Sequence, residues 1–214
     1  MRTIWDISRP LSNDLAPWPG DTPFRYDLSQ HLSEACSVNV GAIITSVHNG
    51  THTDAPFHFT GKGATVGKLP LQNYLGPAVV IDLAREFSRT QPFITITDLE
   101  QARFQIAETR RILLKTSCFP DSRRFPDWIP VLQAETIAWM RELRVVLLGV
   151  DLPSVDPIEA KVLANHHALT AGNVSIVESL DLSEIEAGVY HFVALPLKIL
   201  AADAAPVRAL LWRE

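Results

Sequence analysis

The amino-acid sequence predicts a mixed α/β fold, in which a strand-rich, mixed or antiparallel, barrel-like sheet is surrounded by a few helices. The chain has 214 residues, a length that favours one domain. Fifteen prolines and ten glycines separate short runs rich in β-branched residues, which is typical of strands. These runs do not alternate regularly with long helices, which argues against a doubly wound parallel sheet. We therefore expect residues 1–214 to form a single domain.

The predicted strands are spread along the whole chain. Each is a short apolar or β-branched run bounded by turn residues, and they are expected at Thr3–Ile7, Ser37–Val47, Ala78–Leu83, Arg111–Thr116, Val145–Val150, Val174–Val177, Val189–Leu195 and Val207–Trp212. The proline-rich segment 10–26 is expected to be a loop inside the domain. Loops of that length in compact domains are often functional.

Helices are expected in fewer places. Residues 97–100 have the spacing of a capping box, so a short helix is expected to follow them. The segments Glu135–Leu143 and Ile158–Leu169 are helical by composition and periodicity. Residues 183–186 also have capping spacing, but Gly188 would end a helix there quickly.

Composition and charge exclude several classes of protein. Apolar residues make up 47% of the chain and charged residues 20%, as in ordinary globular domains and unlike disordered chains. The 24 acidic and 19 basic residues give a net charge of −5, so neither nucleic acid nor an anionic membrane surface is an expected partner. The first ten residues lack the apolar run of a secretion signal, and we expect a cytoplasmic protein.

The segment from His48 to His58 carries the strongest chemical signal. It reads HNGTHTDAPFH, holds three of the seven histidines, and places His48, His52, Asp54 and His58 at even positions. Its glycine and proline oppose a helix, and on an extended chain side chains two residues apart point to one side. We therefore expect His48, His52 and Asp54 to present metal ligands to one point. The alternative is a surface histidine cluster without metal, because a His-x3-His pair alone is common and the glutamate of a zincin helix is missing.

A second cluster of candidate ligands lies in the C-terminal half. His166 and His167 fall within the predicted helix, and Glu178 follows the strand at Val174–Val177. A histidine and a carboxylate on either side of a helix-to-strand turn can converge on one ion. Adjacent histidines equally fit a helix surface with one neighbour facing the core, and the residues alone do not choose between them.

The pattern His-x-Gly-Thr-His-x-Asp-x-Pro-x-His over residues 48–58 resembles the signature of the metal-dependent cyclase family. Further segments that carry this resemblance are Trp5–Leu11, Pro17–Thr22, Gly149–Asp151, Ser154–Asp156, and His166 followed by Glu178. Together they cover nearly the whole chain. Within the family, the loop that contains Trp18 makes the chain similar to the bacterial kynurenine formamidases.

The resemblance implies a site for two divalent metal ions, usually zinc. Carried over position by position, His48, His52 and Asp54 would hold one ion. Asp54 would bridge to a second ion held by His166 and Glu178, since the twelve-residue interval before Glu178 matches the family pattern. The resemblance also implies a barrel-like sheet ringed by helices and a homodimer.

Two further residues receive roles from the same resemblance. His58 would be the acid/base residue, and its alternative is a further metal ligand. Trp18 would line the substrate pocket, and its alternative is a hydrophobic plug beneath the proline-rich loop. Replacement of His58 would separate its two roles, because loss of a ligand removes metal whereas loss of an acid/base group does not.

The activity implied is that of a metal-dependent arylformamidase in tryptophan degradation. Such an enzyme hydrolyses N-formyl-L-kynurenine to L-kynurenine and formate, with metal-activated water as the nucleophile and His58 transferring protons. The sequence contains no GxSxG elbow and no nucleotide-binding glycine motif. Two other hypotheses are a related cyclase-family hydrolase of a cyclic amide such as isatin, and a non-catalytic metal- or ligand-binding module.

Overall fold

The fold is built around one nine-stranded sheet. A computed structural model describes residues 3–83 and 85–213, and the strands lie in the order β1-β13-β11-β5-β7-β9-β10-β4-β12. Their bounds are β1 Ile4–Asp6, β4 His52–Asp54, β5 Leu75–Asp82, β7 Arg111–Lys115, β9 Leu147–Val150, β10 Ser175–Glu178, β11 Gly188–Val193, β12 Ala204–Pro206 and β13 Leu210–Trp212. The four strands from β5 to β10 run parallel and the others pair antiparallel. The prediction of a mixed sheet is therefore confirmed.

The central parallel strands are buried on both faces. In β7, Ile112 and Leu114 belong to the core on one side of the sheet, whereas Leu113 belongs to the core on the other. Strands covered on both faces read as continuous apolar runs, which is why these strands were visible in the sequence. Gly149 in β9 is needed for this packing, because a Cβ atom there would lie 2.5 Å from the Leu113 side chain and 2.7 Å from that of Leu180.

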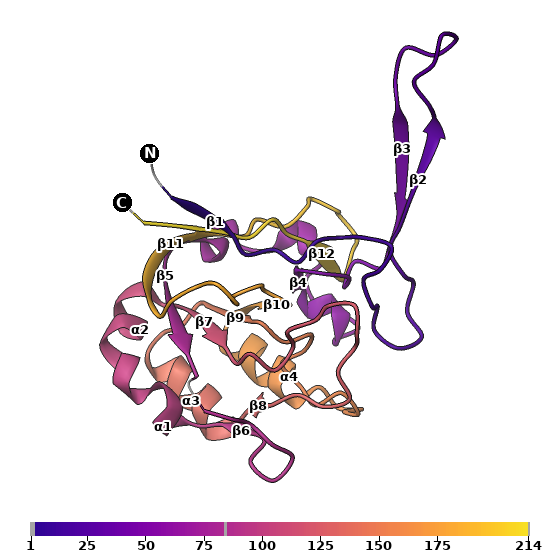
Figure 1. The fold of residues 1–214 in the computed structure, drawn as a ribbon. Coiled ribbons are helices and arrows are strands. Elements are labelled where there is room, and N and C mark those ends of the chain that lie inside the picture. The colour runs from indigo at the N-terminus through magenta and orange to yellow at the C-terminus, as the bar shows by residue number, and fades with distance from the viewer. Residues whose placement is uncertain (1–2, 84, 214) are drawn as a thin grey trace.

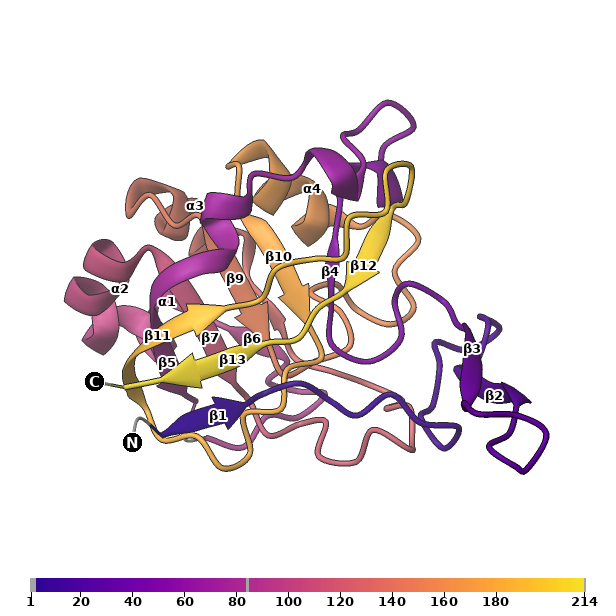
Figure 2. The same cartoon turned by 90° about the horizontal axis from the view of Figure 1, so that it is seen from above.

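Helices cover one face of the sheet, and the curl of the sheet encloses the core on the other (Figures 1 and 2). The helices are α1 Ile96–Leu99, α2 Arg103–Thr109, α3 Ala134–Glu142 and α4 Ala164–Ala171. Ile106, Met140 and Leu169 are fully buried between these helices and the sheet. Within residues 3–83 and 85–213, no helix is long and apolar enough to span a membrane.

Short elements complete the body of the protein. They are the 3-10 helices η1 Pro56–His58, η2 Val66–Lys68, η3 Leu71–Tyr74 and η4 Glu100–Ala102, and a small parallel sheet of β6 Phe93–Ile94 with β8 Val131–Leu132. Of these, η1 follows β4 after one residue and therefore lies close to the strand that carries His52 and Asp54.

A two-stranded arm stands away from the body. It consists of β2 Arg25–Gln30 and β3 Val40–Ile44, which pair antiparallel. Figure 1 shows it projecting from the molecule. Every residue of both strands is exposed, including the apolar side chains of Tyr26, Ile43 and Ile44.

The helix predictions need three corrections. The capping box involves Thr95 and Asp98 rather than residues 97–100. The helix predicted at Ile158–Leu169 is α4, which begins six residues later, and residues 183–186 form no helix but contain a turn at residues 183 and 184. In the last case the Asp181 side chain accepts hydrogen bonds from the Ser183 amide and hydroxyl, an alternative to helix that such residues favour.

Candidate metal centre and active site

Strand β4 places two of the predicted ligands on one face of the sheet. It pairs with β10, which sets His52 opposite Glu178, and with β12, which sets Ala204 opposite Asp54. His52 and Asp54 are two residues apart and therefore point to the same side. Thr53 points to the other side, where its hydroxyl lies 3.0 Å from that of buried Tyr74.

The turn before β4 positions the first histidines. Gly50 has a φ of +65°, which side-chain-bearing residues rarely adopt. The carbonyl oxygen of Gly50 lies 2.9 Å from Nδ1 of His52. Donation from Nδ1 to that carbonyl leaves Nε2 of His52 as the free ring nitrogen, which is the tautomer that a metal ligand needs.

The start of α4 brings His166 to the same place. Asp156 accepts hydrogen bonds from the backbone amides of Asn165 and His166 at 2.9 and 3.0 Å, and its Oδ2 lies 2.7 Å from Nδ1 of His166. The ring is thereby held with Nε2 toward β4. His167 is exposed, so the structure directs His166 and not its neighbour toward the cluster.

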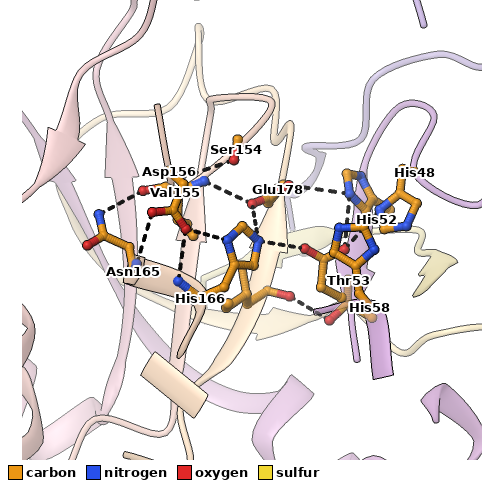
Figure 3. A network of polar contacts seen from close by, with 12 residues as sticks. His48, His52, Thr53, His58, Ser154, Val155, Asp156, Asn165, His166 and Glu178 are labelled. Atoms are coloured by element: carbon orange, nitrogen blue, oxygen red, sulfur yellow. Dashed lines mark hydrogen bonds and ion pairs between the residues drawn. The ribbon is translucent and has the colours of Figure 1, made fainter. Parts of the chain in front are cut away.

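Figure 3 shows the candidate ligand histidines in two groups, His166 on one side of the cluster and His48 and His52 on the other. The carboxylate of Asp54 contacts both groups. Its Oδ1 is 3.1 Å from Nδ1 of His48 and 3.4 Å from Nε2 of His52, whereas its Oδ2 is 3.0 Å from Nε2 of His166. One oxygen faces each group. This is the arrangement expected of a carboxylate that bridges two cations.

Glu178 faces the same two groups. Its Oε2 lies 3.4 Å from Nε2 of His52, and its Oε1 lies 3.5 Å from Nε2 of His166. The backbone amide of Val155 donates to Oε1 at 2.9 Å and fixes the carboxylate. The structure thus brings together the five side chains that the sequence singled out as candidate ligands.

The two buried carboxylates dominate the electrostatics of the cluster. Burial alone would lower the pKa of His52 and of His166. The nearby carboxylates of Asp54 and Glu178 outweigh it for His52 and raise its pKa to about 10, and the carboxylates of Asp156, Asp54 and Glu178 raise the pKa of His166 to about 12. Burial would raise the pKa of Asp54, but the neighbouring histidines, with His166 first among them, hold it well below its usual value. The same negative charge that favours protons on the imidazoles would favour a divalent cation, which displaces such protons on binding.

The donor atoms fit a metal ion. His52 Nε2 and Asp54 Oδ1 are buried and have no hydrogen-bond partner among the described groups, which is costly unless something else satisfies them. The ligand atoms of His48, His52 and Asp54 lie within 4.8 Å of one another, as do those of Asp54, His166 and Glu178. Imidazole nitrogen and carboxylate oxygen are the ligands that zinc and similar divalent ions take in proteins.

A cavity of about 400 Å³ opens onto this cluster, a size within the range of small-molecule sites. Its lining includes all five candidate ligands together with His58, Leu163 and Trp18. The Trp18 ring is half-buried and packs edge-on against Phe125 at 5.0 Å. Trp18 therefore packs against Phe125 and also lines the cavity.

Comparison with known proteins places the chain in a family. The family model named cyclase, described as "Putative cyclase", matches residues 5–157. The chain belongs to the cyclase family. This confirms the family resemblance of the histidine motif.

Sequence-similar members of the cyclase family cover almost the whole chain. A kynurenine formamidase of Bacillus thuringiensis (strain Al Hakam) is 44% identical over 206 residues, which is 96% of this chain and 95% of that protein. A kynurenine formamidase of Bacillus anthracis is 43% identical over the same share of both chains.

Solved structures share the cyclase fold at lower identity. A predicted metal-dependent hydrolase from Bacillus stearothermophilus superposes with a TM-score of 0.80 at 24% identity, covering 100% of both chains. Isatin hydrolase A from Ralstonia solanacearum gives a TM-score of 0.79 at 22% identity, covering 100% of this chain and 92% of that one. At these identities the likeness shows the fold.

Two acidic residues near the cyclase-family motif were not among the predicted site residues. In the sequence, Asp156 belongs only to one of the segments that carry the family resemblance. In the structure, it accepts hydrogen bonds from two amides in the first turn of α4 and orients His166. Asp203 precedes β12, and its Oδ2 lies 2.9 Å from Nε2 of His48. Its one sequence signal is that it is a lone charge between Ala201-Ala202 and Ala204-Ala205.

Proposed function

We propose that this cyclase-family protein is a metal-dependent arylformamidase that hydrolyses N-formyl-L-kynurenine to L-kynurenine and formate. The observation that carries the proposal is the 44% identity to a Bacillus kynurenine formamidase over 96% of the chain. The cavity supports it, because its floor combines imidazoles and carboxylates in metal-ligand geometry and its wall includes an aromatic side chain.

In the proposed site, two divalent ions, most consistent with zinc, are held by five side chains. His48, His52 and Asp54 would hold one ion, and Asp54, His166 and Glu178 the other. Such ions, when bound, lower the pKa of water to near neutrality and polarise a carbonyl oxygen. The two carboxylates would offset the repulsion between the ions, because each presents one oxygen toward His52 and the other toward His166.

The remaining roles belong to the walls of the cavity. His58 is proposed to take a proton from the attacking water and return it to the departing aryl nitrogen, since an imidazole exchanges protons readily near neutral pH. Trp18 is proposed to stack on or against the aryl ring of the substrate, a contact worth about 0.5–1.5 kcal/mol beyond area burial.

Metal removal tests the proposal directly. Purified protein is assayed for formate release from N-formylkynurenine before and after chelation, and after zinc is restored. We expect activity to fall with metal content and to return with it. Equal turnover by metal-free protein would overturn the mechanism. Isatin is assayed as a second substrate beside N-formylkynurenine. A preference for isatin would indicate that the protein hydrolyses a cyclic amide instead.

We propose that the protein works as a homodimer and that the β2–β3 arm contributes to the contact. A two-stranded hairpin is marginally stable alone and needs packing against another surface. Here, Tyr26 is 49%, Ile43 60% and Ile44 51% exposed, so the arm leaves apolar side chains uncovered within its own chain. A second copy of the chain would cover them.

The proposed arm contact can be tested by placing a charge on the exposed surface of the arm. Ile43→Glu should shift the protein from dimer toward monomer in sedimentation velocity at micromolar concentration, because a carboxylate would be buried without a partner at the contact. Phe104→Glu is the matched control, since Phe104 is also exposed but lies on α2 in the body. A monomeric wild type, or an unchanged Ile43→Glu dimer, would contradict the arm-mediated contact.

A further inference from the structure

Asp203 is an acidic residue that contacts two histidines of the cavity lining and that the proposed mechanism does not use. It directly precedes β12 at the edge of the large sheet. Its carbonyl oxygen accepts the amide hydrogen of Ala55 at 2.8 Å, and the carbonyl of Ala202 accepts that of Val66 at 2.9 Å. The backbone around Asp203 is thereby fixed against Ala55, which lies between β4 and η1, and against the first residue of η2.

One oxygen of Asp203 serves two histidines. Its Oδ2 lies 2.9 Å from Nε2 of His48 and 3.3 Å from Nδ1 of His58. The two rings are close to each other, with centroids 4.2 Å apart and a tilt of 44°. Figure 3 shows His48, His52 and His58 gathered on one side of the cluster. The carboxylate therefore contacts one candidate metal ligand and the candidate acid/base residue at once.

The contact determines which nitrogen of His58 carries hydrogen. An ionised carboxylate can only accept hydrogen bonds, so it favours a proton on Nδ1 of a neutral imidazole and leaves Nε2 with its lone pair. Among the described residues, no protein group is hydrogen-bonded to Nε2 of His58, and the ring lines the cavity. For His48 the same carboxylate accepts from Nε2, which leaves Nδ1 facing Asp54.

We propose that Asp203 is a positioning residue, which accepts a hydrogen bond from Nδ1 of His58 and so presents Nε2 of His58 to the substrate cavity. The role of that Nε2 in proton transfer rests on the proposed function, whereas the orientation of the ring does not. Asp203 does not touch the reacting atoms. It acts through His58, as the carboxylate of a histidine–carboxylate pair does in other hydrolases.

The test compares three variants of the zinc-loaded protein. Asp203→Ala removes the acceptor and fits a segment already rich in alanine. We expect it to lower kcat about 10–100-fold, the usual loss for an orienting partner, with KM little changed and zinc content retained. Asp203→Asn keeps an acceptor oxygen and should restore part of kcat. Asp82→Ala is the control, because the side chains of Asp82 and Asp203 are equally exposed, at 39%. Asp82 pairs with Lys115 and lies on β5, three strands away from β10 in the sheet.

Two further readouts separate positioning from a general structural effect. In the His58→Ala background, Asp203→Ala should cause little additional loss, because the two residues act as one unit. Imidazole ¹⁵N NMR, with the His58 signals assigned from the His58→Ala variant, should show hydrogen on Nδ1 in the wild type and a mixture of tautomers in Asp203→Ala.

The outcomes are distinguishable. A full loss from Asp203→Ala in the His58→Ala background, loss of zinc, or an unchanged tautomer would each overturn the positioning role. Zinc loss would instead assign Asp203 to the metal site, either as a ligand in the group that it forms with His48 and His58 or through its contact with His48. If the wild type does not hydrolyse N-formylkynurenine, the proposed function fails, but the NMR comparison still decides the orientation of His58.

Discussion

Replacement of Asp54 by asparagine should deprive both candidate metal sites of a ligand and abolish hydrolysis. Its two oxygens face His48 and His52 on one side and His166 on the other, so a neutral amide weakens both positions together. Asparagine has nearly the same shape, which limits the effect on packing. Because metal stabilisation of the transition state is worth several kcal/mol and each 1.36 kcal/mol is tenfold in rate, the expected loss in kcat is roughly 10³-fold or more.

Metal analysis and turnover of Asp54→Asn are measured on the same sample. Asp82→Asn serves as the control for loss of a carboxylate elsewhere in the sheet. Circular dichroism melting shows whether the variant is folded. A folded Asp54→Asn protein that retains two ions per chain and wild-type turnover would contradict the bridging role.

The second large effect is expected for His58→Ala. General acid–base catalysis typically contributes 10²–10⁴-fold, so kcat should fall by about that factor. His58 lies on η1 beside the cluster, and its Nδ1 is directed to Asp203 rather than to Asp54 or Glu178. We therefore expect both ions to remain bound.

His167→Ala is the matched control for His58→Ala. His167 is an exposed histidine one position from His166 and contacts the Phe59 ring, but it is outside the cavity lining. Its replacement should leave turnover and metal content near wild type. Loss of metal in His58→Ala would instead assign His58 as a ligand.

The central part of the fold was predictable because its strands are buried on both faces. The apolar runs at Ala78–Leu83, Arg111–Thr116 and Val145–Val150 correspond to β5, β7 and β9. Strands at the edge gave weaker signals. Ala204–Pro206 is a strand because it pairs with β4, and alanine and proline have no preference for that state. The exposed strand β2 has no buried face that would produce alternation.

Within the candidate site, local spacing predicted more than long-range contacts could. His48, His52 and Asp54 lie within seven residues, and their convergence follows from an extended chain and one left-handed glycine. The choice of His166 over His167 came only from the family resemblance, because the residues alone left it open. In the structure it follows from the Asp156 hydrogen bond.

Long-range partners account for what was missed. Asp203 is 155 residues from His48 and 145 from His58 along the chain, and the pairing of β12 with β4 brings it beside these histidines. The start of α4 was misplaced for a similar reason. The Asp156 side chain accepts hydrogen bonds from the amides of Asn165 and His166, which follow it by nine and ten residues. A side-chain contact therefore fixes where the helix begins.

The central claim is that two divalent ions share the carboxylate of Asp54, and that Glu178 holds the second of them. Anomalous diffraction from a zinc-loaded crystal, with data on both sides of the zinc absorption edge, tests it most directly. The account predicts two zinc peaks in each chain, one contacting His48, His52 and Asp54 and the other contacting Asp54, His166 and Glu178. A map with no zinc at these side chains, or with a single ion that leaves His166 without a contact, would contradict it.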